Sequence, residues 1–145
     1  MIRVIEARHD FSTTIAPTHH CPMTFSATGV LFSSFEDSIR TDPLIERELE
    51  QNRLSGRPNA PRKRTELAEL ISATREQGYS CMTDGGGDGF GAVSAPVFDV
   101  TGKLVMAVTV FGRSNRVDAH PEGTLTRIVA RTATKISSAF GYRST

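Results

Sequence analysis

The side chains of this chain best suited to chemistry are two cysteines and a pair of histidines beside one of them. His19–Pro22 offers three candidate ligands in a row, but adjacent side chains rarely point at one ion, so we expect exposed loop histidines and no metal site. Cys21 and Cys81 form no CxxC pair and no metal-binding spacing, and we expect two reduced thiols. A catalytic thiolate needs a lowered pKa and usually a resolving partner. A small thiol-dependent enzyme using Cys81 or Cys21 is therefore only the alternative interpretation. Cys81 lies in a predicted strand, where a buried, inert thiol is expected.

A glycine-rich loop is the next segment with chemical potential. Asp84–Gly91 contains five glycines in eight residues, too many for the interior of a strand. It lacks the Gly-Lys-Ser/Thr ending of a phosphate loop, which argues against nucleotide hydrolysis. We expect either a flexible connection or a lid over the strands that follow, and the direct entry into a strand favours the lid.

Gly91–Gly112 predicts two strands joined by a tight turn at Asp99–Gly102. The position of the turn sets the pairing register of the two strands. Pro96 could change this register, because proline has no N–H to donate to the neighbouring strand and therefore implies an edge position or a bulge. The expected pairs are Phe98 with Lys103, Ala92 with Thr109, and Ser94 with Ala107.

The alternation of side chains sorts this hairpin into two faces. One face is bulky and apolar, as expected of a sheet packed on helices: Val93, Ala95, Val97, Leu104, Met106, Val108 and Val110. The other, here called the small face, is partly hydroxylated and ends in one aromatic ring: Ala92, Ser94, Val105, Ala107, Thr109 and Phe111. A small face of this kind is expected either under a closely packed helix or under a bound ligand.

The remaining elements follow from apolar periodicity and turn residues. We expect strands at Ile2–Ala7, Ser12–Ala16 and Tyr79–Met82. The first helix is capped by Ser26 or Thr28 and runs to about Phe35. The second begins at Asp42-Pro43, has Leu44, Ile45 and Leu49 as its apolar stripe, and is ended by Asn52–Gly56. The third carries Leu67, Leu70, Ile71 and Thr74 and runs up to Gly78, and the last has an apolar face of Leu125, Ile128, Val129, Thr132, Ala133, Ile136 and Phe140. Between the second and third helices, Gly56–Arg64 is expected to be a solvated basic loop.

Composition excludes several functions. The chain has 145 residues, enough for one domain with a real core, and 38% hydrophobic against 23% charged residues is ordinary for a globular protein. A net charge of +1 argues against a dedicated nucleic-acid binder. No apolar run approaches a membrane span and no signal peptide opens the chain, so we expect a cytoplasmic protein.

Several segments in order resemble the C-terminal effector-binding domain of the IclR family of bacterial transcriptional regulators. The likeness spans essentially the whole chain and rests on these segments: Ser26–Gly29, Gly78-Tyr79, the acid-plus-glycine loop, Ala95–Asp99 with Gly102, Gly112, and Ala133–Gly141. It implies a GAF-like α/β (α+β) fold with an antiparallel sheet flanked by helices and a pocket for a small organic acid. It also implies no catalysis and no cofactor.

The pocket positions of the family carry over onto three parts of this sequence. The first turn falls on Ala27, Thr28 and Gly29, the acidic loop on Met82, Thr83 and Asp84, and the hairpin contributes Ala92, Ser94, Thr109 and Phe111. All four hairpin positions belong to the small face that the alternation alone selects.

Departures from the family pattern bear on the ligand and on the parent protein. Family members often have an acidic pair at Met82-Thr83, and some have Cys or Ser at Ala92 and Ser at Phe111. The resemblance therefore implies a larger, more apolar carboxylate than a two- or three-carbon keto acid. The winged helix through which the family binds DNA is absent, as are the domain's opening helix and strand, so we expect an N-terminally truncated domain over residues 1–145 that binds no nucleic acid itself and forms a homodimer or homotetramer.

Overall fold

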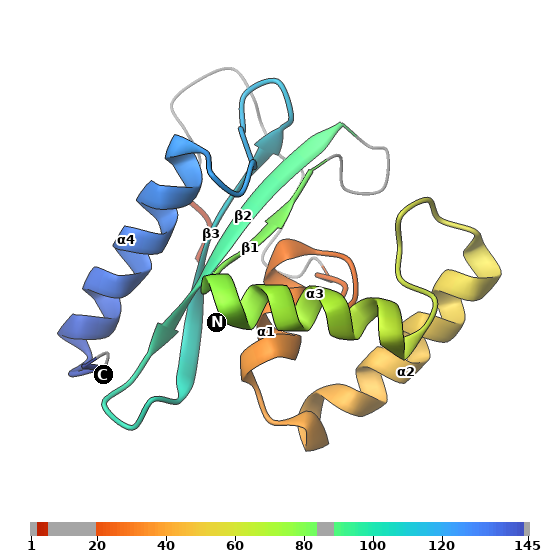
Figure 1. Ribbon diagram of the computed structural model, residues 1–145, viewed down its shortest axis with the longest axis horizontal. Helices are drawn as coiled ribbons and strands as arrows, with labels where there is room; N and C mark the ends of the chain where they lie inside the picture. Colours follow the sequence, from red (N-terminus) through yellow and green to blue (C-terminus); the bar gives the residue numbers. More distant parts are fainter. Residues whose placement is uncertain (1–2, 6–19, 84–88, 144–145) are drawn as a thin grey trace.

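The predicted antiparallel sheet flanked by helices is present, and among the described residues it has three strands. The computed structural model describes residues 3–5, 20–83 and 89–143. In chain order the elements are α1 (Ala27–Phe35), α2 (Ser38–Ser55), α3 (Arg64–Gln77), β1 (Ser80–Met82), β2 (Phe90–Phe98), β3 (Leu104–Arg113) and α4 (Thr124–Ala139). The strand order is β1-β2-β3. Helix α4 covers one side of the sheet and α1 the other, with α2 and α3 beyond it (Figure 1).

The predicted register of the hairpin was wrong by two residues. In the structure Ala92 pairs with Phe111, Ser94 with Thr109, and Pro96 with Ala107. The cause is a longer connection than expected together with an irregularity at Val97/Phe98, where the pairing slips by one residue. Because the total slip is even, nearly every side chain keeps its predicted face.

Pro96 lies on the central strand and is tolerated there because β1 is short. The pairing of β1 with β2 ends at Ser80 opposite Ser94, so no ladder partner flanks Pro96 on the β1 side. The bulge that proline can signal is present, but one residue further along, between Val97 and Phe98.

The turn is held by one carboxylate. Asp99 Oδ1 accepts hydrogen bonds from Thr101 N at 2.8 Å, Thr101 Oγ1 at 2.6 Å and Lys103 N at 3.1 Å. Gly102 has φ 78°, the left-handed conformation that the sequence predicted for it. These bonds stabilise the charged form of the carboxyl, and the hydroxyl of Thr101 is the largest cause that lowers the pKa of Asp99.

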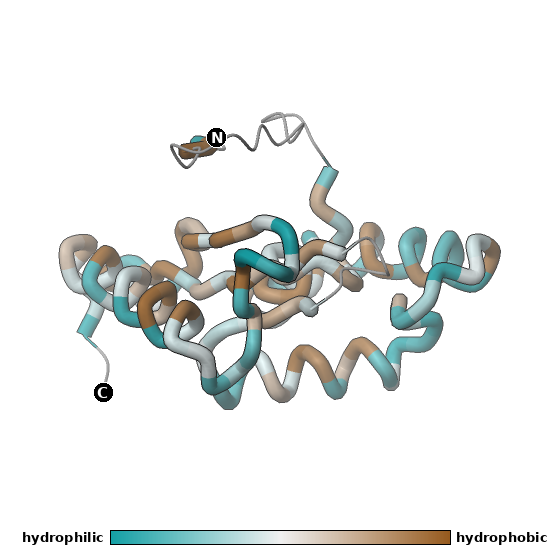
Figure 2. The backbone as a smooth tube through the Cα atoms, turned by 90° about the horizontal axis from the view of Figure 1, so that it is seen from above, coloured by the Kyte–Doolittle hydropathy of each residue, from teal (hydrophilic) through white to brown (hydrophobic). Residues whose placement is uncertain are grey.

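The bulky face of the sheet packs against α4. Val93 and Val97 are completely buried and Ala95 is nearly so, and all three contact the cluster that Val129 and Ala133 of α4 complete. Met106 departs from the prediction, because at 39% exposure it lies near the turn end of β3, beyond this cluster. Along the helices, hydrophobic and hydrophilic residues alternate, as expected of elements with one covered side (Figure 2).

Helix α1 begins at a tight cap that brings it close to the preceding segment. Ser26 Oγ accepts from Gly29 N at 2.9 Å and donates to Pro22 O at 2.7 Å, which confirms Ser26 as the predicted cap. An added Cβ on Gly29 would lie 1.9 Å from Pro22 O, so this position accepts only glycine without backbone movement. The glycine therefore sets how closely α1 approaches Pro22 and Met23.

The predicted start of α2 was wrong. The helix begins at Ser38, and its cap is Asp37, whose Oδ1 accepts from Ile39 N at 3.0 Å. Pro43 lies inside the helix on the exposed side, where it removes one intrahelical hydrogen bond. Leu44 is also exposed, whereas Ile45 and Leu49 are buried as predicted. Gly56 ends the helix in the left-handed conformation.

Helices α3 and α4 match their predicted extents, but fewer of their apolar residues are buried than predicted. Gly78 caps α3 in the left-handed conformation as predicted. The predicted core residues Leu70, Ile128 and Phe140 are at least two-fifths exposed. Of the predicted N-terminal strands, Arg3–Ile5 has no strand structure, and the rest of Ile2–Ala7 and all of Ser12–Ala16 lie outside the described residues, as does most of the glycine-rich loop.

We predict that Asp99→Asn lowers stability at neutral pH and that the difference from wild type shrinks in acid. The pKa of Asp99 is lower in the folded than in the unfolded chain. Its stabilisation is therefore complete above the unfolded value of about 3.9 and is lost as the pH falls through the folded value. Urea unfolding at pH 7 and below pH 3 measures the difference.

Glu69→Gln provides the control for loss of one negative charge, since Glu69 is exposed on α3 and away from the turn. A deficit of Asp99→Asn that is equally large at both pH values would contradict the role of the ionised carboxylate.

Candidate functional site

Three hydroxyl groups connect α1 to the small face. Thr28 Oγ1 lies 2.9 Å from Thr109 Oγ1, and Thr109 Oγ1 lies 2.8 Å from Ser94 Oγ. Ser94 is completely buried while Thr109 is exposed, so the three hydroxyls run from the core to the surface. Residues from α1, β2 and β3 thus form one polar group.

The other end of the small face is aromatic. Phe111 stacks on Phe90, with ring centroids 5.1 Å apart and an interplanar angle of 11°. Phe111 is 40% exposed and pairs with Ala92, which is half-buried. Phe90 was not among the predicted site residues. The signal was available, because Phe90 is two residues before Ala92 and alternation places both on one face.

The strand β1 extends the same face. Met82 pairs with Ala92, and Ser80 with Ser94, so Met82 lies next to Ala92 on the side that faces α1. Thr83 follows the strand and is exposed, and Asp84 lies outside the described residues.

The first-turn residues play different parts. Thr28 reaches the small face, whereas Ala27 and Gly29 are buried and support the packing of α1. The small face is therefore covered by α1 around Ser94 and open around Ala92 and Phe111. The predicted packed helix therefore describes the half around Ser94, and ligand binding at the other half stays a prediction.

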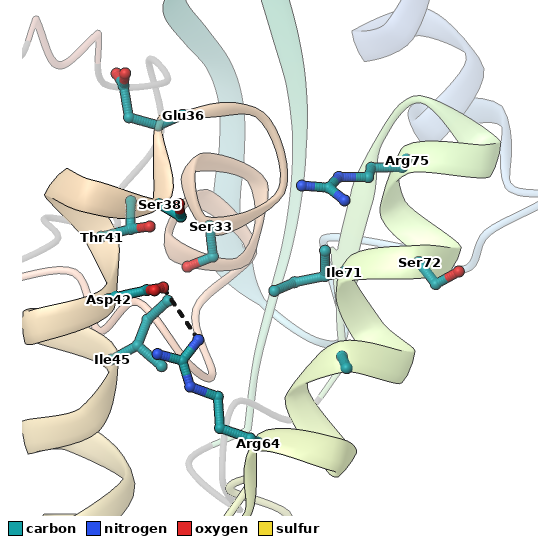
Figure 3. Close-up of a pocket in the computed structure, with 11 residues that line it drawn as sticks. Ser33, Glu36, Ser38, Thr41, Asp42, Ile45, Arg64, Ile71, Ser72 and Arg75 are labelled. Carbon is teal, nitrogen blue, oxygen red and sulfur yellow. Dashed lines mark hydrogen bonds and ion pairs between the residues drawn. The ribbon is translucent and has the colours of Figure 1, made fainter.

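Two cavities lie beside α1, and one of them borders the small face. One, of about 190 Å³, lies between α3, β1 and the start of α1, and Met82 is among its lining residues. The other, of about 490 Å³, lies between α1, α2 and α3 and is lined by none of the predicted site residues (Figure 3).

The thiols have surroundings that oppose reactivity. Partial burial raises the pKa of the Cys81 thiol, and partial desolvation also raises the pKa of Cys21, although that residue is exposed. Cys81 lies in β1 as predicted, with its sulfur 3.7 Å from Thr126 Oγ1. Among the described residues, no three His, Cys, Asp or Glu side chains gather as metal ligands. His20 instead lies 3.2 Å from the buried carboxylate of Glu48, which also accepts from the backbone and hydroxyl of Thr24.

The family model described as bacterial transcriptional regulator IclR C-terminal matches residues 1–138. The chain belongs to the IclR C-terminal family. Its members and the structural neighbours below are domains of transcriptional regulators and not enzymes. In the part of the chain that the structure describes, no helix is long and apolar enough to cross a membrane.

Solved structures of IclR-type regulators share the fold. HmgR of Pseudomonas aeruginosa is 26% identical, with a TM-score of 0.78 over 94% of this chain and 52% of that one, so the chain spans about half the length of HmgR. The inducer-binding domain of PobR from Acinetobacter, a double mutant in complex with 3-hydroxybenzoic acid, is 20% identical with a TM-score of 0.66, covering 87% and 74%. The C-terminal domain of KdgR from E. coli is 20% identical with a TM-score of 0.64, covering 83% and 72%. The comparison with curated proteins gives no match.

We predict that Thr109→Val destabilises the protein by about 1–3 kcal/mol, because the buried hydroxyl of Ser94 then loses its partner. The double variant Ser94→Ala/Thr109→Val should recover part of the loss, since no buried hydroxyl remains unsatisfied. Urea unfolding measures both. A single variant as stable as wild type would mean that the three hydroxyls do not act together.

Proposed function

We propose that residues 1–145 form one effector-binding domain of an IclR-type regulator, and that a small organic carboxylate binds on the open half of the small face. The proposal rests on the two ends of the small face, because one end carries hydroxyl groups and the other carries aromatic rings. The exposed Thr28–Thr109 hydroxyl pair lies at one end, and the Phe90–Phe111 stack lies at the other. Ala92 between them leaves room, since its side chain is a single methyl group.

The residues favour an aromatic or larger apolar acid. In this proposal the carboxylate accepts hydrogen bonds from Thr28 and Thr109 and from the first N–H groups of α1, and the ring packs against Phe111. The complex of the PobR inducer-binding domain with 3-hydroxybenzoic acid supports this class of ligand, because that domain shares the fold. Met82, Thr83 and Asp84 would border the ligand from the β1 side, and no cofactor or metal takes part.

A thermal-shift screen against aliphatic and aromatic carboxylates tests the proposal. A ligand at one hundred times its dissociation constant should add about 2.7 kcal/mol of stability. We expect the largest shifts with aromatic acids such as 3-hydroxybenzoate. A screen in which no carboxylate raises the melting temperature would contradict the proposal.

We predict that Ala92→Phe abolishes the binding of 3-hydroxybenzoate at little cost in stability, because the ring would fill the open floor. Overpacking of a filled core costs about 1–3 kcal/mol instead. Phe111→Ser should enlarge the site and shift its preference toward smaller, more polar acids. Isothermal calorimetry and urea unfolding measure the two effects.

Ala139→Phe is the matched control, because Ala139 is exposed at the end of α4. An Ala92→Phe protein that is markedly unstable, or that binds normally, would show that the small face is ordinary core.

The regulatory output is proposed to lie in other parts of a cytoplasmic parent protein. A separate winged-helix domain would bind DNA, and effector binding here would control it through a homodimer or homotetramer. We predict a self-associating chain at tens of micromolar in sedimentation and no sequence-selective shift of DNA in gel electrophoresis. A strictly monomeric sedimentation profile would contradict the proposed homodimer or homotetramer. A sequence-selective DNA shift would contradict the proposal that a separate winged-helix domain binds the DNA.

A further inference from the structure

A polar groove separates the helices α2 and α3 on the side away from the sheet. Both helices pack around α1, and the space between them has a volume of about 490 Å³ (Figure 3). Residues spaced by three or four positions line it from each helix, among them Asp42 and Ile45 of α2 and Ile71 and Arg75 of α3. The small side chain of Ala68 leaves the α3 wall open.

Arg75 supplies an uncompensated positive charge at one end of this groove. Its Nε donates to the backbone carbonyl of Ser34 at 2.6 Å, which fixes the position of the guanidinium. The remaining nitrogens point into the groove (Figure 3). No acidic group among the described residues pairs with Arg75. A fixed guanidinium with two free donors is suited to a carboxylate, which it can bind in a bidentate manner.

Each of the other charged side chains that line the groove has an ion-pair partner, because Arg64 is shared by two carboxylates and Glu36 lies 3.7 Å from Arg40. Arg64 donates to Glu46 Oε1 at 2.6 Å and to Asp42 Oδ1 at 3.1 Å, and the bond to Glu46 is the main cause that raises the pKa of Arg64. The carboxylate of Glu36 accepts from Asp37 N and points away from Arg75 (Figure 3). Arg75 is therefore the one charged side chain of the lining without an ion-pair partner among the described residues.

The wall between the two arginines is apolar. Ile45 is almost completely buried and Ile71 half-buried, and both side chains reach into the space between the helices (Figure 3). We propose that this groove is a second ligand site, separate from the small face, for a small organic monocarboxylate. Arg75 binds the carboxylate and Ile71 contacts the apolar body, close to the almost completely buried Ile45.

Methyl NMR with benzoate as the probe tests this site directly. In protein labelled at the isoleucine δ1 methyls, benzoate should shift the signals of Ile45 and Ile71 saturably and leave Ile128 and Ile136 of α4 unchanged. Acetate, which has the carboxylate without the apolar body, should bind at least several-fold more weakly. The amides of Ala92 and Thr109 report on the small face in the same titration, so failure at one site is separated from failure at the other.

Two variants probe the groove in different ways. Arg75→Gln should weaken the response of Ile45 and Ile71 by about tenfold or more, because a charge-assisted bond is lost. Arg131→Gln on α4 removes the same charge from an exposed position and should not change it. Ala68→Phe should also abolish the response by filling the groove, without touching Arg75.

The proposal is overturned by any of three results: no saturable shift of Ile45 and Ile71 with benzoate, unchanged affinity in a folded Arg75→Gln protein, or acetate binding as tightly as benzoate.

Discussion

The burial of β2 on both sides is the constraint on which the rest of this domain depends. Val93 and Val97 on one side and Ser94 on the other are all inaccessible to solvent. A strand covered on both faces needs bulky residues toward one helix and small residues toward the other, because α1 approaches closely. The hydroxyls of Ser94 and Thr109 then satisfy each other where the helix covers them.

Much of this fold could be predicted from the sequence, because it depends on the alternation of side chains along the strands and on residues that cap the helices. From Ala92 to Val97 the two faces of the hairpin were predicted correctly even though the register was not, since a slip of two residues leaves the faces unchanged. Leu104 is the exception, because beyond the irregularity it pairs with Phe98 and not with a residue of the bulky face. The bulge at Val97/Phe98 has no local signal apart from the nearby Pro96. The start of α2 was misread because Asp42-Pro43 is a strong helix-opening pair, while Asp37 supplies the actual cap.

Part of the candidate site could likewise be predicted from the sequence, and part of it could not. Thr28, Ser94 and Thr109 could be grouped in advance, and the structure places their hydroxyls in contact. The α2–α3 groove could not, because Arg75 faces it only through the packing of three helices and a bond to the carbonyl of Ser34. Helix α1 therefore carries Thr28 at its beginning and the Arg75 contact near its end, so both proposed sites lie against one short helix.

The most direct test of the central claim is a crystal structure of the chain with 3-hydroxybenzoate. The account predicts the carboxylate within hydrogen-bond distance of the Thr28 and Thr109 hydroxyls and the ring against Phe111. A structure in which the small face is closed by side chains, with the acid bound elsewhere or not at all, would contradict it.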